Sequence, residues 1–181
     1  MAVQAGGYTL EGRITLRTSR DGLAAQAGHD LTIEVGTWSG ELVIGADLAP
    51  ASLDVRAELG SLVVLAGTGG IKPLTDRDRK EILATARKVL SADRHPEATF
   101  TASSFSPAAD GGTIDGTLTL AGESGPLRLA VREAGPDRYV ATATVRQLSF
   151  GIKPYSGFLG ALKVSDDVAV EAEVGLTAAS G

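Results

Sequence analysis

The chain has 181 residues, of which 43% are hydrophobic and 22% are charged, and its formal net charge is -5. Such a chain is typical of one globular domain, which we place over residues 1–181 with a core at about 8–177. The acidic balance argues against nucleic acid and anionic membrane surfaces as partners. The absence of cysteine excludes disulfides, thiolate metal sites and cysteine nucleophiles.

The first residues, Met1–Tyr8, have neither a basic start nor an apolar run, so they do not resemble a signal peptide. No stretch approaches the roughly 20 apolar residues that cross a bilayer. We therefore expect a cytoplasmic protein without stable membrane insertion, unless the chain has lost the leader of an exported form.

The first sixty residues alternate between apolar and polar side chains, which is typical of β-strands with one buried face. The apolar positions of three successive runs are Leu10, Ile14 and Leu16, then Leu31, Ile33 and Val35, then Leu42 and Ile44. Gly36 and Thr37 predict a tight connection between the second and third runs. Residues 55–59 predict a further strand. Residues 60–73 are rich in glycine, and we expect a loop that folds back onto the other strands.

Residues 75–90 interrupt this alternation and predict a helix. Apolar side chains recur there at helical spacing, at Ile82, Ala86 and Val89. Thr75 and Asp78 are spaced as an N-terminal capping pair, and Pro73 and Pro96 bracket the segment. The chain is therefore expected to run as strands, one helix, and then more strands.

The second half of the chain returns to alternation with period two. It predicts strands over 99–105, 113–121, 127–132, 139–146 and 168–176, with a turn at 122–125. The whole chain then holds about eight strands. Successive antiparallel strands with one apolar face bury that face when the sheet closes on itself. We predict an all-β fold, a closed antiparallel eight-stranded barrel with one α-helix inserted between strands.

A barrel of eight strands is just wide enough to be filled by side chains or to hold one small ligand. Small residues are frequent at the expected inward positions: Gly12, Gly40, Gly116, Ala141, Ala143 and Ala172. Only 4% of the residues are aromatic, so this lining fills a barrel poorly. The alternative is a flattened sandwich whose two faces interdigitate. Alternation alone leaves both interpretations open.

The inward positions predict the residues that would line such a cavity. They are Leu31, Ile33, Leu42, Leu118, Leu129, Ala143 and Val170. His29 falls on the same apolar face, either as a polar anchor for a head group or as a hydrogen-bonded core histidine. Trp38 is either a plug at the barrel end or a core residue.

Residues 149–160 leave a strand and concentrate aromatic side chains, glycines and a lysine. One interpretation is an ordered connection packed by its own aromatics. The other is a flap at the barrel mouth, in which Lys153 and Tyr155 face a polar head group while Phe150 and Phe158 contact an apolar chain.

A Ser-His-Asp hydrolase is the main enzymatic alternative. The chain has no G-x-S-x-G motif, and Gly67–Lys72 lacks the order of a phosphate-binding loop. His95 follows the helix and is expected to cap it or to face solvent. Two separated histidines without cysteine are weak support for a metal site. We predict no catalytic residue, no metal, no cofactor and no enzymatic activity.

Five motifs in order resemble the YceI-like, polyisoprenoid-binding family. They are Gly28-His29-Asp30-Leu31 with Trp38-Ser39-Gly40, Pro96-Glu97-Ala98-Thr99-Phe100-Thr101-Ala102-Ser103, Ile114-Asp115-Gly116-Thr117-Leu118-Thr119-Leu120, Ser149-Phe150-Gly151-Ile152, and Leu162-Lys163-Val164-Ser165-Asp166. The resemblance extends from about Tyr8 to Leu176. No single motif is specific, but their order with a helix between the halves is.

The resemblance implies a lipocalin-like barrel with a long internal tunnel and an amphiphile with an isoprenoid tail as ligand. We therefore expect a lipid-binding carrier or storage protein for a polyisoprenoid or isoprenoid quinone. A homodimer is possible. The alternative is a structural or stress-related interaction module whose barrel is filled and takes no ligand.

Overall fold

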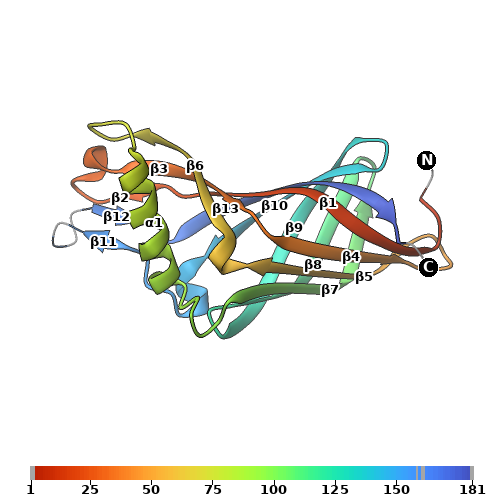
Figure 1. Cartoon of the computed structure of the whole chain (residues 1–181). Coiled ribbons are helices and arrows are strands. Elements are labelled where there is room, and N and C mark those ends of the chain that lie inside the picture. Colours follow the sequence, from red (N-terminus) through yellow and green to blue (C-terminus); the bar gives the residue numbers. More distant parts are fainter. Residues whose placement is uncertain (1–2, 158, 160–161, 180–181) are drawn as a thin grey trace.

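The computed structural model describes residues 3–157, 159 and 162–179 of the chain. Eight long antiparallel strands form a closed barrel, and one helix packs near one end of it (Figure 1). Around the barrel the strands are β1 (Gly6–Arg17), β4 (Trp38–Ile44), β5 (Pro50–Glu58), β7 (Glu97–Ala108), β8 (Gly111–Leu120), β9 (Glu123–Gly135), β10 (Arg138–Arg146) and β13 (Asp167–Ala178). The predicted closed barrel with one inserted helix is confirmed.

The first and last strands close the barrel. β1 and β13 pair in antiparallel register from Tyr8 opposite Ala178 to Arg17 opposite Ala169. This ladder joins the two ends of the sheet, so their hydrogen-bonding groups are not left as open edges. The alternating apolar positions of all eight strands consequently face one interior.

Two of the predicted strands are one bent strand. β3 (His29–Val35) and β4 both run antiparallel to β1, with Thr15–Arg17 opposite β3 and Gly6–Thr9 opposite β4. Gly36 and Thr37 form the tight connection predicted between them, but the chain continues in the same direction instead of reversing. The bend is held from outside the strand, because the backbone N–H of Gly36 donates to the carbonyl of Ser61 at 3.0 Å.

The prediction of a loop over residues 60–73 is wrong for most of that segment. Residues 62–69 form strand β6 (Leu62–Gly69), which continues β5 after a short 3-10 turn (Leu59–Ser61) and pairs along β3. Leu62 and Val64 are buried, whereas Val63 and Leu65 are exposed. Four consecutive apolar residues conceal this alternation in the sequence.

The turn predicted at 122–125 is shorter than expected. Leu120 pairs with Glu123 across the β8–β9 hairpin, which leaves only Ala121 and Gly122 in the turn. Both have positive φ, +52° and +84°, as a two-residue hairpin turn of this hand requires. Residues 123–125 therefore belong to β9.

The helix α1 (Asp76–Val89) covers the place where the sheet divides. Beyond Glu58 the chain leaves β7, and β6 becomes a free sheet edge beside α1. The Arg79 guanidinium donates to the carbonyls of Val64 and Leu65 at 2.6 and 3.1 Å, which protects that edge from pairing with another chain. The predicted capping box at Thr75 and Asp78 is present.

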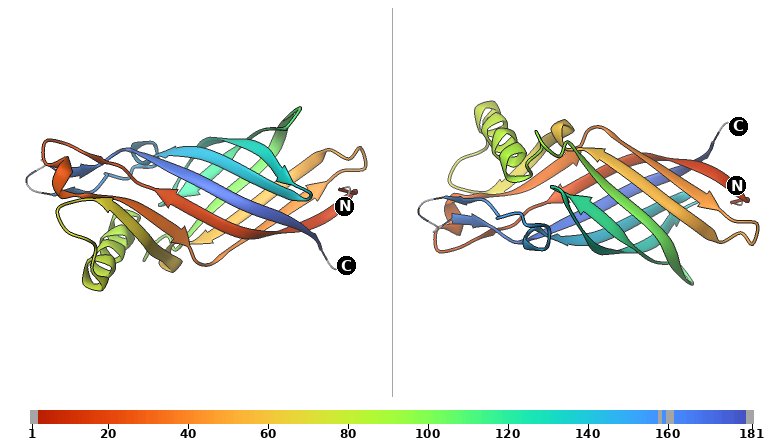
Figure 2. Two further views of the ribbon diagram at one scale, coloured as in Figure 1. Left: turned by 90° about the horizontal axis from the view of Figure 1, so that it is seen from above. Right: turned by 90° about the horizontal axis from the view of Figure 1, so that it is seen from below.

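A small second sheet lies at the same end of the barrel as α1. It consists of β11 (Ser156–Gly157), β12 (Leu162–Val164) and β2 (Arg20–Asp21) in that order. We call this sheet, with the loops at 22–28 and 70–75, the tip. Figures 1 and 2 show the tip at one end of the barrel and both chain termini at the other.

Gly12 lies in β1 between the parts that pair with β4 and β3. Its φ is +144°, and a Cβ there would collide with the backbone carbonyl of Glu173. Only glycine lets β13 approach β1 this closely, so the closing ladder depends on this residue.

We expect Gly12→Ala to lower the free energy of unfolding by about 2 to 4 kcal/mol, because it combines a strained φ with a steric clash. Urea unfolding followed by tryptophan fluorescence measures this. Gly60→Ala is the control: a Cβ at that exposed glycine meets nothing within 4 Å, and its stability should match the wild type. Equal stability of the two variants would contradict the argument.

Candidate functional site

The barrel encloses a cavity of about 1190 Å³. All eight barrel strands contribute to its wall. Most of the wall is aliphatic, at Leu10, Ile14, Leu16, Leu42, Leu53, Val55, Ile114, Leu118, Leu127, Leu129, Val131, Val145, Val168, Val170, Val174 and Leu176. A volume above the roughly 300–1,000 Å³ of common ligand pockets, with such a lining, suits a long apolar molecule.

Alanines and glycines affect the cavity differently. Ala141, Ala143 and Ala172 line it, as predicted. Glycines at two inward positions do not create space, because larger neighbours fill it: a Cβ at Gly40 would meet the Leu10 side chain, and one at Gly116 would meet the Phe100 ring. Of these small residues, the alanines of β10 and β13 therefore border the cavity, whereas the space beside Gly40 and Gly116 is filled.

Helix α1 closes part of the opening between β6 and β7. One face of the helix lines the cavity with Ile82, Ala86 and Val89. Leu74, just before the helix, packs against the buried cluster to which Leu62 and Val64 of β6 belong. The helix therefore supplies the side wall that the diverging strands leave open.

Polar groups gather where the cavity reaches the tip. His29, Lys72 and Tyr155 all belong to its lining there. The His29 Nε2–H donates to the carbonyl of Lys72 at 2.7 Å, and the ring packs beside Gly70, whose φ is +73°. His29 thus fastens the loop between β6 and α1 to the start of β3.

Two carboxylates of α1, those of Asp78 and Glu81, also border the cavity. The backbone N–H and the hydroxyl of Thr75 donate to the Asp78 carboxylate at 2.8 and 2.7 Å. These bonds hold the pKa of Asp78 below its ordinary value, and the charge of His29 adds to the effect. Asp78 is therefore an anionic capping group at the cavity's edge.

The opposite end of the cavity contains one phenol, that of Tyr139 on β10. Burial raises the pKa of Tyr139, and the neighbouring acids Glu133 and Asp137 raise it further. The phenol is thus a neutral hydrogen-bonding group within an apolar wall.

The structure brings most of the residues predicted for the site into one wall. The predicted residues that line the cavity are His29, Leu31, Ile33, Trp38, Leu42, Leu118, Leu129, Ala143, Tyr155 and Val170. Lys153 is exposed and absent from the wall. Phe158 lies outside the described residues.

Phe150, predicted to contact the ligand, is instead a core residue. Its side chain is only 3% exposed and packs over Gly125. It borders a second pocket of about 660 Å³ beside β9 and β10, which shares Leu127, Ala143 and Val170 with the cavity wall. Pairing of the two strands stops there after Thr142 opposite Ala130. Phe150 therefore packs into the barrel wall where β9 and β10 are no longer hydrogen-bonded to each other.

Sequence reasoning named no residue of β5 or of the helix for the site. Leu53, Val55 and Ala57 alternate inward on β5, but the proline and charged residues around them weaken that pattern. The sequence showed a periodic apolar stripe on the helix, but it did not show which part of the protein that stripe contacts.

Other kinds of site find little support in the part of the chain that the structure describes. There, no three His, Cys, Asp or Glu side chains lie close enough to hold a metal ion. None of the described helices has the length and hydropathy to cross a bilayer.

Comparison with known proteins agrees with this architecture. The family model for the YceI-like domain matches residues 11–176. The crystal structure of Burkholderia cenocepacia BcnA is similar, with a TM-score of 0.60 and 16% identity over 92% of this chain and 96% of that one. A Campylobacter jejuni YCEI protein gives a TM-score of 0.61 and 16% identity over 82% and 85% of the two chains. No curated protein sequence matched.

We expect His29→Ala to release the loop at 70–74, because the variant loses the hydrogen bond to Lys72. Amide exchange of this loop, followed by mass spectrometry, should accelerate about fivefold to tenfold. The turn at 45–49, at the other end of the barrel, is the internal control and should not change. Unaltered exchange at 70–74 would contradict a fastening role for His29.

Proposed function

The chain belongs to the family of YceI-like domain proteins, and we propose that it binds one long apolar amphiphile, a polyisoprenoid or isoprenoid quinone, inside the barrel without catalysing a reaction. The observation that carries this proposal is the aliphatic cavity of about 1190 Å³. An interior of that volume, lined by Leu, Ile, Val and Ala, offers dispersion contacts along a tail and few hydrogen bonds.

The hydrophobic term is large enough for useful affinity. Burying about fifteen carbons supplies on the order of 12 kcal/mol at about 0.8 kcal/mol each. Association and ordering cost about 4 to 15 kcal/mol. Binding near micromolar, about 8 kcal/mol, is therefore attainable from the tail, and the head group acts mainly on specificity.

The distribution of polar groups favours one orientation of the ligand. His29, Lys72, Asp78 and Tyr155 lie where the cavity reaches the tip, whereas Tyr139 is the phenol of the opposite end. A head group with hydrogen-bonding oxygens finds both donors and acceptors at the tip. We place the head group there and the tail along the barrel.

The alternative of a barrel filled by its own side chains, serving only as an interaction module, is not favoured by a cavity of this size. A void left empty would be destabilising, so a guest in the interior is the simpler account. A hydrolytic role is not favoured, because the Nε2 of His29 is engaged by the carbonyl of Lys72.

Organic extraction of the natively purified protein should release about one amphiphile with an isoprenoid tail per chain. Mass spectrometry of the extract, together with native mass spectrometry of the intact protein, checks both identity and stoichiometry. A protein that is empty when purified from its own host, and that stays empty after incubation with an isoprenoid quinone, would overturn the proposal.

Ala143→Phe should narrow the cavity, since Ala143 lies on its wall. We expect quinone uptake to fall at least about fivefold, because added bulk in a fitted site costs about 1–3 kcal/mol. Thr144→Phe is the matched control: it adds the same ring one residue along, where the side chain is exposed. Equal uptake by the two variants would show that the assigned wall is wrong.

A further inference from the structure

Large apolar side chains are exposed on three separate loops of the tip. Leu23, after β2, is 101% exposed; Ile71, between β6 and α1, is 79% exposed; and Leu159, between β11 and β12, is 109% exposed. Single exposed leucines are common on protein surfaces. Three at the same end of a barrel, each on a different loop, need a partner to explain them.

These loops are neighbours in space. β12 pairs with β2, with Lys163 opposite Asp21, so the loops carrying Leu159 and Leu23 leave one small sheet. Arg20 ties this sheet to the other loops: its Nη1 donates to the carbonyl of Gly28 at 2.7 Å, and its guanidinium lies against Gly69 at the end of β6. The three apolar side chains thus belong to one surface.

Lysines accompany this surface. The chain has five lysines: Lys72, Lys80, Lys88, Lys153 and Lys163. Three of them belong to the tip or to the segment that enters it, and the other two are on α1. Lys72, Lys153 and Lys163 are exposed, and within the described part of the chain none of the three forms a salt bridge. Two exposed acids accompany them, Asp21 in the tip and Asp76 directly after the loop at 70–75.

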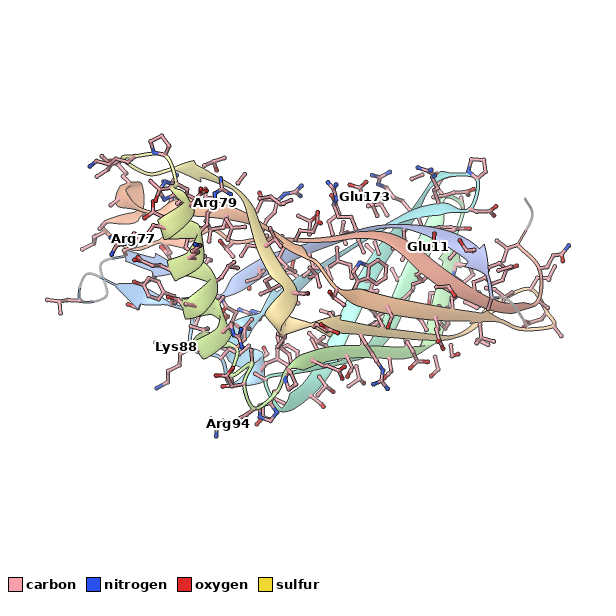
Figure 3. The ribbon with its side chains drawn as sticks, viewed as in Figure 1. Glu11, Arg77, Arg79, Lys88, Arg94 and Glu173 are labelled. Atoms are coloured by element: carbon pink, nitrogen blue, oxygen red, sulfur yellow. The ribbon has the colours of Figure 1, made fainter. Side chains whose placement is uncertain are left out.

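The opposite end of the barrel carries no lysine. Two of its hairpin turns hold the exposed acids Asp47 and Asp110, and the third holds Asp137 next to the exposed Arg138. In Figure 3 the labelled basic side chains lie on or near α1, and the labelled acids Glu11 and Glu173 lie along β1 and β13. The net charge of -5 therefore does not reveal that the lysines lie toward one end of the barrel.

The exposed tip is continuous with the cavity. Ile71, Lys72 and Tyr155 are exposed and also line the cavity. Ala27, Gly28, Leu162 and Val164 of the tip line it as well. A molecule that covers the tip therefore faces the mouth of the cavity.

We propose that the tip docks onto the surface of an anionic lipid bilayer, with Leu23, Ile71 and Leu159 entering the head-group region and Lys72, Lys153 and Lys163 contacting lipid phosphates. Isolated apolar side chains separated by unpaired lysines suit an interface that is apolar below and anionic above. The acidic turns at the other end orient the barrel, because an anionic surface repels them.

Docking in this orientation turns the cavity mouth toward the lipids. A tail then passes between bilayer and barrel with little exposure to water. Transfer of a tail between bilayer and barrel rests on the proposed ligand binding. Docking of the tip onto the bilayer does not, and the two are tested separately.

The test is sedimentation of the purified full chain with phosphatidylcholine vesicles, and with vesicles containing about one third phosphatidylglycerol. We expect binding to the anionic vesicles to exceed binding to the neutral ones at least about tenfold, and to weaken with added salt. The variant Leu23→Ser with Lys153→Glu and Lys163→Glu should lose at least about tenfold of that binding. None of these three residues lines the cavity, so quinone uptake from detergent solution should be retained.

Val43→Ser is the matched control. Val43 is 43% exposed on β4, outside the cavity wall and away from the tip, and its variant should bind anionic vesicles like the wild type. Equal wild-type binding to neutral and anionic vesicles, or no binding to either, would overturn the proposal. The proposal would also be overturned if the wild type formed dimers but did not bind vesicles, and the triple variant no longer formed those dimers. The tip would then be a surface for a second copy of the chain. A wild type that binds anionic vesicles but takes up no quinone would instead reject the proposed function alone.

Discussion

The structure depends on the pairing of β1 with β13. This ladder turns a sheet with two open edges into a closed wall, so the apolar face of every strand must meet the others in one interior. A barrel of about eight strands is just wide enough either to be filled by its side chains or to hold one ligand. The side chains that line the interior then decide between the two, and here Ala141, Ala143 and Ala172 contribute short side chains to a cavity wall that all eight strands form.

The barrel wall opens where β6 diverges from β7, and this opening lies at the same end of the molecule as the tip. After Glu58 the chain follows β3 instead of β7, so the sheet divides and its interior is exposed. Helix α1 covers the division, and Arg79 satisfies the carbonyls of the free edge of β6. The loop that leads into the helix, fastened by His29, becomes part of the mouth. Fold and site are thus connected through one local departure from the barrel.

Charge follows the same axis. Because the strands run back and forth, consecutive loops alternate between the two ends, and loops distant in sequence share one end. Lys72, Lys153 and Lys163 meet at the tip in this way, while Asp47 and Asp110 lie at the other end. An overall acidic chain can therefore gather lysines and exposed apolar side chains at the mouth of its cavity, which the net charge alone does not reveal.

The sequence by itself determined most of the strands, the helix with its cap, and which side chains of those strands point inward, because these follow from local periodicity that each strand or helix carries in its own residues. The same periodicity left a hollow barrel and a flattened sandwich both open. It predicted eight strands, but for residues 31–35 and 40–44 it could not distinguish one bent strand from two, and it mistook β6 for a loop, because pairing partners are set by distant residues. Only the tertiary structure decided that Leu10 and Phe100 fill the space beside Gly40 and Gly116, that Phe150 seals the wall, and that the lysines gather at one end. Each of these depends on which side chains meet across the barrel or share one of its ends, which no single segment of the sequence encodes.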